Sequence, residues 1–185
     1  MRLFSFVFQT PDFRARVERA RPRLYRLAYS WCHDPALADD LVQDALYKAL
    51  KSAGQLRDMA VLEGWLFKIL ANCWRDHFRR RRDIQDIDDM DELPFTGGCS
   101  PEDLRSQSEL AARVRKAVAR LPLGQRQVLT LIDLEDASYS EAAEILNIPV
   151  GTVMSRLCRA RAALKTQLID TRGDAATKVN IRSVP

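Results

Sequence analysis

Apolar residues recur three and four positions apart along most of the chain, a spacing that predicts helices rather than strands. The first such stripe comprises Phe13, Val17, Ala20, Leu24, Leu27 and Trp31. Pro22 lies inside this stripe and is expected either to kink the helix or to restart it. Asp34 followed by Pro35 supplies an N-cap acid and a first-turn proline for a second helix. The apolar stripe of that helix is Leu37, Leu41, Ala45 and Ala49.

A third helix is predicted over residues 62–82, after a loop around residues 52–60 that contains Gly54. Two neighbouring stripes run along this helix. The first contains Leu62, Leu66, Ile69, Cys73 and His77. The second contains Phe67, Trp74 and Phe78. Aromatic residues at helical spacing belong more often to a core than to a base-stacking platform, so packing is favoured for Trp74 and Phe78 and base stacking is the alternative. The polar face of the helix carries Asn72, Arg75, Asp76 and Arg79.

Residues 83–103 contain turn residues and too little periodicity for a helix, so they are expected to be a flexible linker. Beyond them comes a stripe of Leu110, Val114, Ala117 and Leu121, and then a second amphipathic run, "LPLGQRQVLTLIDLE". The pattern therefore predicts an all-α fold of two small helical domains joined by an acidic linker. The expected segments are a first domain over 1–82, a linker over 83–103, a second domain over 104–168 and a flexible tail over 169–185.

The second domain ends in a pattern typical of a helix-turn-helix. Ser138 and Glu141 have capping-box spacing and predict a short helix over about 140–146. A tight turn over 147–151 follows, and then a longer helix that ends near Lys165. The inward stripe of the longer helix is Val153, Leu157, Ala160 and Leu164, which leaves its arginines outside. Charge and periodicity alone fit a solvated basic helix equally well, but the capped helix directly upstream favours DNA binding.

Composition and charge point to the same kind of partner. The formal net charge of the 185 residues is +4, but residues 83–103 hold eight acids and no lysine or arginine, so the rest of the chain is more strongly basic. A basic body suggests a polyanionic partner such as nucleic acid. The N-terminal run "LFSFVF" is too short for a signal-peptide core, and no later run reaches membrane-spanning length, so a cytoplasmic protein without membrane insertion is expected.

The chain resembles a known family in two separate places. The segment "LPLGQRQVLTLIDLEDASYSEAAEILNIPVGTVMSRLCRARAALK" closely resembles region four of bacterial sigma factors of the extracytoplasmic-function (ECF) group. The N-terminal half resembles region two through "ADDLVQDALYKAL", similar to the polymerase-binding helix, and "GWLFKILANCWRDHFRRRR", similar to the promoter-melting helix. The two motif sets occur in family order and cover residues 24–165.

This resemblance implies a specificity subunit that binds core RNA polymerase, directs initiation from promoters and is controlled by an anti-sigma factor. The implied polymerase-binding residues are Asp40, Leu41, Gln43, Asp44 and Lys48. In the region-two helix, Asn72 corresponds to the asparagine that contacts a flipped base of the -10 element, and the loop over 59–64 would complete its pocket. Phosphate contacts there are expected from Arg75, Arg79 and Arg80.

For the -35 element, the resemblance implies base reading by Met154, Ser155, Cys158 and Arg159, with Thr152, Arg156 and Arg161 at phosphates. Two positions depart from the family pattern, since Met154 stands where a basic residue is common and Cys158 where an aromatic residue or histidine is frequent. Neither side chain makes the bidentate guanine contact of an arginine, so apolar contact with a thymine methyl group is expected there.

Three alternatives remain open at this point. The chain fits an ordinary helix-turn-helix regulator with an N-terminal sensor or dimerisation domain, although such a protein has no use for both region-two segments. Cys32, His33, Cys73 and His77 suggest a zinc site, but their spacing matches no known zinc motif, and we expect no metal and no cofactor. The acidic linker fits either a solvated tether or a mimic of the transcript. The sequence contains no recognisable catalytic motif, so the protein is not expected to be an enzyme.

The four cysteines, Cys32, Cys73, Cys99 and Cys158, are widely spaced in a chain for which no export signal is predicted. This usage is typical of reduced thiols in a cytoplasm, and we expect no disulfide bond.

Overall fold

The computed structural model of the protein describes residues 11–56, 58–82 and 109–169, with the side chains of residues 80–82, 109 and 110 outside the description. Every regular element in this part of the chain is a helix, so the all-α prediction is confirmed. The described helices fall into two compact units, one mainly from the N-terminal half of the chain and one mainly from the C-terminal half. The predicted linker over 83–103 lies outside the described residues.

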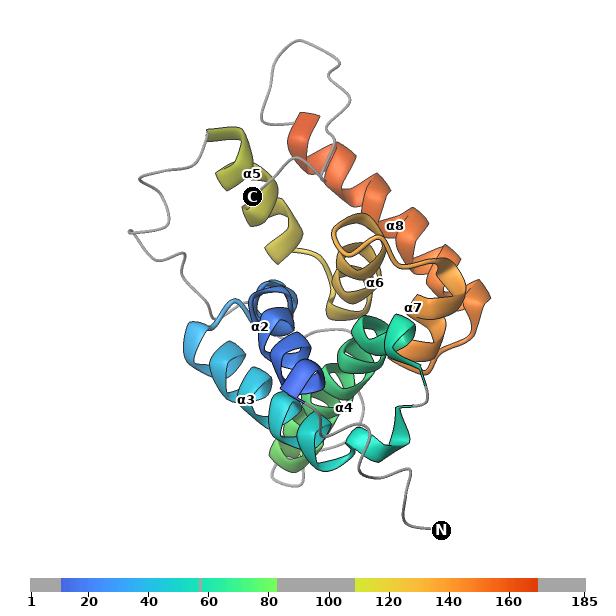
Figure 1. Ribbon diagram of the computed structural model, residues 1–185. Helices are drawn as coiled ribbons and strands as arrows, with labels where there is room; N and C mark the ends of the chain where they lie inside the picture. The colour runs from blue at the N-terminus through green and yellow to red at the C-terminus, as the bar shows by residue number, and fades with distance from the viewer. Residues whose placement is uncertain (1–10, 57, 83–108, 170–185) are drawn as a thin grey trace. The chain divides into compact units, whose positions relative to one another are not determined.

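Within the described residues, the N-terminal unit is a bundle of three helices with two short 3-10 turns, and Figure 1 shows these helices side by side. Its elements are α2 (Pro11–Cys32), α3 (Pro35–Lys51), η1 (Ala53–Gln55), η2 (Met59–Val61) and α4 (Leu62–Arg82). Helix α2 continues through the exposed Pro22, so the alternative of a restarted helix is wrong. The side chain of Asp34 accepts hydrogen bonds from the backbone N–H groups of Ala36 (2.9 Å) and Leu37 (3.2 Å), which confirms it as the N-cap of α3.

Aromatic side chains at the centre of this bundle pack on one another. Trp31 of α2 meets Trp74 of α4 edge to face, with ring centroids 6.0 Å apart, and both indole groups are buried. Phe78 is half-buried with its ring centroid 4.5 Å from that of Trp74. Packing is therefore the role of Trp74, as the sequence favoured, and Phe78 extends the same cluster.

The C-terminal unit is built around α8, which packs against α5 and α6. The helices of this half are α5 (Glu109–Ala119), α6 (Leu123–Asp133), α7 (Tyr139–Leu146) and α8 (Val150–Ile169). The predicted inward stripe of α8 is confirmed, because Val153, Leu157, Ala160 and Leu164 are all buried. The prediction of its ends was less accurate, since α8 begins inside the expected turn and runs four residues beyond Lys165.

A buried arginine joins α6 to the end of α5. The side chain of Arg126 is only 7% exposed, and its Nη2 donates hydrogen bonds to the backbone carbonyl oxygens of Ala119 and Leu121, each at 2.9 Å. These carbonyls belong to the last residue of α5 and to the connection after it, where no further helical N–H is available to them. The guanidinium, which comes from the first turn of α6, thus supplies hydrogen bonds to the end of α5 and fixes the short α5–α6 connection.

Cys32, Cys73 and Cys158 are free thiols in the described part of the chain, whereas Cys99 lies outside it. Among the helices that the structure describes, none combines the length and the apolar character needed to cross a membrane.

We expect Arg126→Met to destabilise the C-terminal unit by about 2–4 kcal/mol, because it keeps the aliphatic stem but leaves two buried carbonyls without their donor. Hydrogen exchange of the amide groups in α5 and α6 measures this locally, which matters because the two units need not unfold together. The matched control is Arg120→Met at an exposed position beside α5, for which a change within about 0.5 kcal/mol is expected. Equal protection in the two variants would contradict the capping role.

Candidate nucleic-acid interface

Hydrogen bonds and one left-handed residue fix both ends of the short helix α7, which a turn joins to the long helix α8. At the start of α7, the Ser138 hydroxyl accepts the N–H of Glu141 at 3.2 Å, and the Glu141 carboxylate accepts the N–H of Ser138 at 2.8 Å. At its end, Asn147 adopts the left-handed conformation (φ 54°, ψ 50°), and the N–H of Ile148 donates to the carbonyl of Ala143. This confirms the capping box, and the left-handed residue stops α7 and redirects the chain.

Helix α8 then begins at once, because the carbonyl of Pro149 accepts the N–H groups of Thr152 (2.9 Å) and Val153 (3.1 Å). The turn between the helices is therefore only three residues long, residues 147–149. Two helices joined by so short and so well determined a connection form the helix-turn-helix arrangement that the sequence predicted.

The outward side of α8 carries the side chains predicted to read bases. Met154 is 54% exposed, and Cys158 and Arg159, one turn further along, are also exposed. Ser155 is half-buried; its hydroxyl donates to the carbonyl of Thr152 at 3.1 Å and accepts from Nη2 of Arg159 at 3.5 Å. The four predicted reading residues thus lie on one side of the helix, opposite its buried stripe.

Arg161, predicted to contact a phosphate, is exposed on α8 and pairs with an acidic side chain of α6. Its guanidinium makes two hydrogen bonds to the Asp133 carboxylate at the end of α6, with Nη2–Oδ1 at 2.7 Å and Nε–Oδ2 at 3.4 Å. The carboxylate of Asp133 is largely buried, and its bonds to Arg161 raise the pKa of that guanidinium further. The pair ties α8 to α6. Sequence spacing could not reveal this partner, because 28 residues separate the two side chains.

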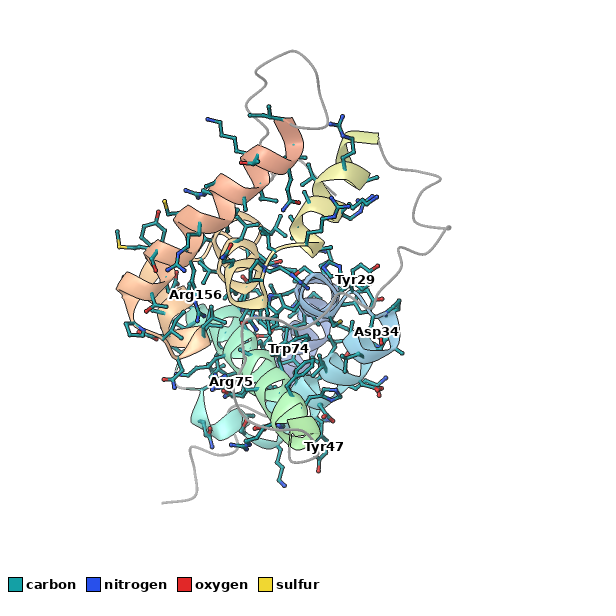
Figure 2. The ribbon with its side chains drawn as sticks, turned by 180° about the vertical axis from the view of Figure 1, so that it is seen from behind. Tyr29, Asp34, Tyr47, Trp74, Arg75 and Arg156 are labelled. Carbon is teal, nitrogen blue, oxygen red and sulfur yellow. The ribbon has the colours of Figure 1, made fainter. Side chains whose placement is uncertain are left out.

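Arg156 lies on α8 as well (Figure 2), half-buried and close to Gly124 near the beginning of α6. Thr152 is half-buried at the start of α8. Gly124 carried no signal in the sequence pattern, and its importance becomes visible only when α6 and α8 are packed together.

On α4, the exposed polar face contains Asn72 and Arg75, the latter labelled in Figure 2. Arg79 is exposed and donates to the Asp76 carboxylate at 3.1 Å. The side chain of Arg80 lies outside the described residues. Asn72 therefore projects from a helix whose opposite side is anchored in the core by Trp74, an arrangement suited to holding an unpaired base.

The loop before α4 is more ordered than the sequence predicted. Residues Met59–Val61 form a 3-10 turn, and the Asp58 carboxylate accepts the N–H of Ala60 at 2.8 Å to cap it. Val61 is 57% exposed, whereas Leu62 is 5% exposed and belongs to the core. The accessible part of the predicted pocket loop consequently includes the turn and Glu63, whose exposed carboxylate pairs with Arg23 at 2.6 Å.

The predicted polymerase-binding face on α3 needs one correction. Asp40, Gln43 and Asp44 are exposed as expected, but Leu41 is only 2% exposed and packs inside the bundle, so it is unavailable to a partner. Lys48 is half-buried and pairs with Asp76 at 3.3 Å. Tyr47, which the sequence pattern did not single out, is 65% exposed on the same helix (Figure 2).

The cysteines and histidines of the N-terminal unit have ordinary structural surroundings. Burial raises the pKa of the Cys73 thiol, and Lys48 beside it compensates only part of this rise, so the thiol remains protonated. The His77 ring packs edge to face on Phe78, and Cys32 donates to the carbonyl of Asp34 at 3.2 Å. Among the described residues, no group of three or more histidine, cysteine or acidic side chains is close enough to hold a metal ion.

A capped helix, a three-residue turn and a second helix with cations on its outward side define a DNA-binding protein of the helix-turn-helix class. The sequence matches the family described as Sigma-70 region 2 over residues 16–84 and the family described as Sigma-70, region 4 over residues 111–164.

Relatives match nearly the whole chain. The ECF RNA polymerase sigma factor EcfG of Rhodopseudomonas palustris is 34% identical over 182 residues, which cover 95% of this chain and 96% of that protein. The ECF RNA polymerase sigma factor SigM of Mycobacterium tuberculosis is 35% identical over 164 residues, which cover 89% of this chain and 79% of that protein. The chain therefore belongs to the ECF sigma factors of RNA polymerase.

Solved structures agree with this assignment. The sigma factor RpoE from Bartonella quintana, crystallised with the anti-sigma factor NepR, matches with a TM-score of 0.67 and 31% identity, over 88% of this chain and 100% of that chain. CnrH, solved in complex with the cytosolic domain of CnrY, matches with a TM-score of 0.60 and 27% identity, over 89% and 92% of the two chains.

We expect the charge of Glu141 to stabilise α7 in a pH-dependent way. The hydroxyl and backbone N–H of Ser138 hold the pKa of Glu141 below its ordinary value, so its contribution to stability is full above about pH 4.3 and is lost as the pH falls through the lowered pKa. Glu141→Gln preserves the shape without the charge. Its Tm should lie slightly below that of the natural protein at pH 7 and approach it in acid, as thermal unfolding followed by circular dichroism can measure. A Tm difference that stays constant from pH 7 to pH 3.5 would rule this out.

Proposed function

We propose that this ECF sigma factor reads promoters at two points, with the exposed face of α4 at the -10 element and the outward face of α8 at the -35 element. The observation that carries the proposal is that both family matches, region 2 and region 4, occur in one chain, and each contains a helix with an exposed polar face opposite a buried apolar stripe. Each reading surface is thereby held rigidly by its own small core.

At the -10 element, promoter opening requires a base to leave the stack, which costs a few kcal/mol and must be recovered by contacts to the extruded base. Asn72 supplies one amide donor pair and one carbonyl acceptor at an exposed position, a combination suited to a base edge. Arg75 and Arg79 lie along the same face and would bind the neighbouring phosphates. The capped turn Met59–Val61 would shape the rest of the site.

At the -35 element, Arg159 is the strongest base reader on α8, because a guanidinium can donate two hydrogen bonds to a guanine. Its contact with the hydroxyl of Ser155 restricts its rotamers before DNA arrives. Met154 and Cys158 offer apolar contact to thymine methyl groups beside it. Thr152 and Arg156 lie at the flanks for phosphates, whereas Arg161 acts through its pair with Asp133.

For core RNA polymerase, the proposed docking surface is the acidic and polar face of α3, with Asp40, Gln43, Asp44 and the partly buried Lys48. Tyr47 joins this set because a largely exposed aromatic side chain among carboxylates is typical of a binding surface. An anti-sigma protein is the proposed regulator, since a similar structure is that of a sigma factor held by its anti-sigma factor.

We further propose that the protein acts in the cytoplasm together with the polymerase and contributes no catalytic group of its own. Synthesis of the transcript belongs to the core enzyme, and this subunit supplies promoter specificity and the energy of base capture.

Reconstituted transcription tests this function directly. Added to bacterial core polymerase with fragments of genomic DNA, the protein should produce discrete transcript starts that core alone does not give. Mapping the starts would reveal the two elements and their spacing.

The rival reading as an ordinary regulator predicts another outcome. A regulator would bind duplex DNA tightly as the free protein, and its addition to core would create no new starts. That result would exclude the sigma function.

Asn72→Ala should reduce promoter opening by about fivefold or more, because hydrogen bonds from a side-chain amide to a base edge are worth about 1–3 kcal/mol. Permanganate reactivity of unpaired thymines at the -10 element measures opening, and binding to core polymerase serves as the internal control. Core binding is expected to remain unchanged, since Asn72 lies on α4 and the proposed docking surface is on α3. If Asn72→Ala opened promoters as the natural protein does and still bound core polymerase, Asn72 would have no role in capturing the base.

A further inference from the structure

Arg156 and Gly124 come together where α8 packs against the beginning of α6. Gly124 is the second residue of α6, and Arg156 lies in the second turn of α8. A Cβ atom built on Gly124 would lie 2.7 Å from Nη1 and 2.9 Å from Cζ of Arg156, and 3.2 Å from its Nε. Carbon atoms do not approach a guanidinium so closely. The space that the guanidinium occupies therefore exists because residue 124 has no side chain.

The charge of this guanidinium gains nothing from the helix end beside it in the free protein. It lies at the N-terminal end of α6, which carries partial positive charge from its unpaired N–H groups and so repels rather than attracts a cation. Within the described residues, no carboxylate forms an ion pair with Arg156, in contrast to Arg161, which is held by Asp133. A guanidinium beside a helix N-terminus concentrates positive charge at one spot, and an anion such as a DNA phosphate would compensate it.

We propose that Gly124 is a positioning residue for recognition of the -35 element. It leaves the space in which the Arg156 guanidinium lies against the start of α6, and from there Arg156 binds a backbone phosphate of the duplex. Gly124 acts only through Arg156. The inference rests on the proposed function above, in which α8 enters the major groove of the -35 element.

The test is Gly124→Ala, measured as binding of the complete holoenzyme to promoter DNA across a range of salt concentrations. We expect the affinity for promoter DNA to fall about three- to tenfold. The slope of log affinity against log salt should also decrease in magnitude. This decrease should be no larger than in Arg156→Ala, for which the loss of one phosphate contact predicts a change of about one unit. The Tm should be unchanged or higher, because alanine favours a helix over glycine and the atoms that must move are the flexible end of a side chain. Gly151→Ala, where an added Cβ meets nothing within 4 Å, is the matched reference for that stability gain.

Pairing the two variants separates positioning from a merely structural effect. In the Arg156→Ala background, Gly124→Ala should cause no further loss of affinity. The inference would be overturned if Gly124→Ala bound promoter DNA with the affinity and salt slope of the natural protein. It would also be overturned if Gly124→Ala lowered the affinity further in the Arg156→Ala background. If Arg159→Ala weakens promoter binding and Arg156→Ala does not, the Gly124 inference fails alone. If neither does, the proposed -35 reading by α8 fails as well.

Discussion

The C-terminal unit depends on the hydrogen bonds that the buried Arg126 guanidinium donates to the end of α5. Helices of eleven residues, such as α5 and α6, are marginal in isolation and owe their stability to packing and to satisfied ends. By binding the carbonyls of Ala119 and Leu121, Arg126 sets the angle at which α6 leaves α5. Helix α8 packs against both, and Asp133 at the end of α6 then holds Arg161. The direction of α8 thus follows from its contacts with α5 and α6.

Most of the fold could be predicted because its signals are local. The Asp34 cap, the Ser138–Glu141 capping box and the buried stripe of α8 each depend on residues within one or two turns, where helical spacing makes their geometry calculable. The end of α8 was missed because no glycine or proline marks it before residue 170. Pro22 was ambiguous because an exposed proline is tolerated when tertiary packing supports both halves of a helix.

The candidate site could be predicted only in part, because its remaining features depend on contacts between helices distant in sequence. Leu41 entered the polymerase-binding set through the family resemblance, although its place on the apolar stripe of the same helix already predicted its burial. Arg161 was grouped with Arg156 as a phosphate contact, and nothing in the sequence indicated that Arg161 pairs with Asp133 of a different helix. Gly124 could not be recognised at all, since a glycine in "LPLGQRQ" carries no information about what lies against it.

The separation between the buried and outward faces of α8 has an evolutionary consequence. Stability resides in Val153, Leu157, Ala160 and Leu164, whereas Met154 and Cys158 bear almost none of it. Substitutions at exposed positions away from such packing are close to neutral for folding. Under the proposed reading of the -35 element by α8, a duplicated gene can therefore explore new promoter preferences at these two positions without first acquiring compensating mutations, so paralogues in one genome can diverge toward separate sets of target genes while keeping one scaffold.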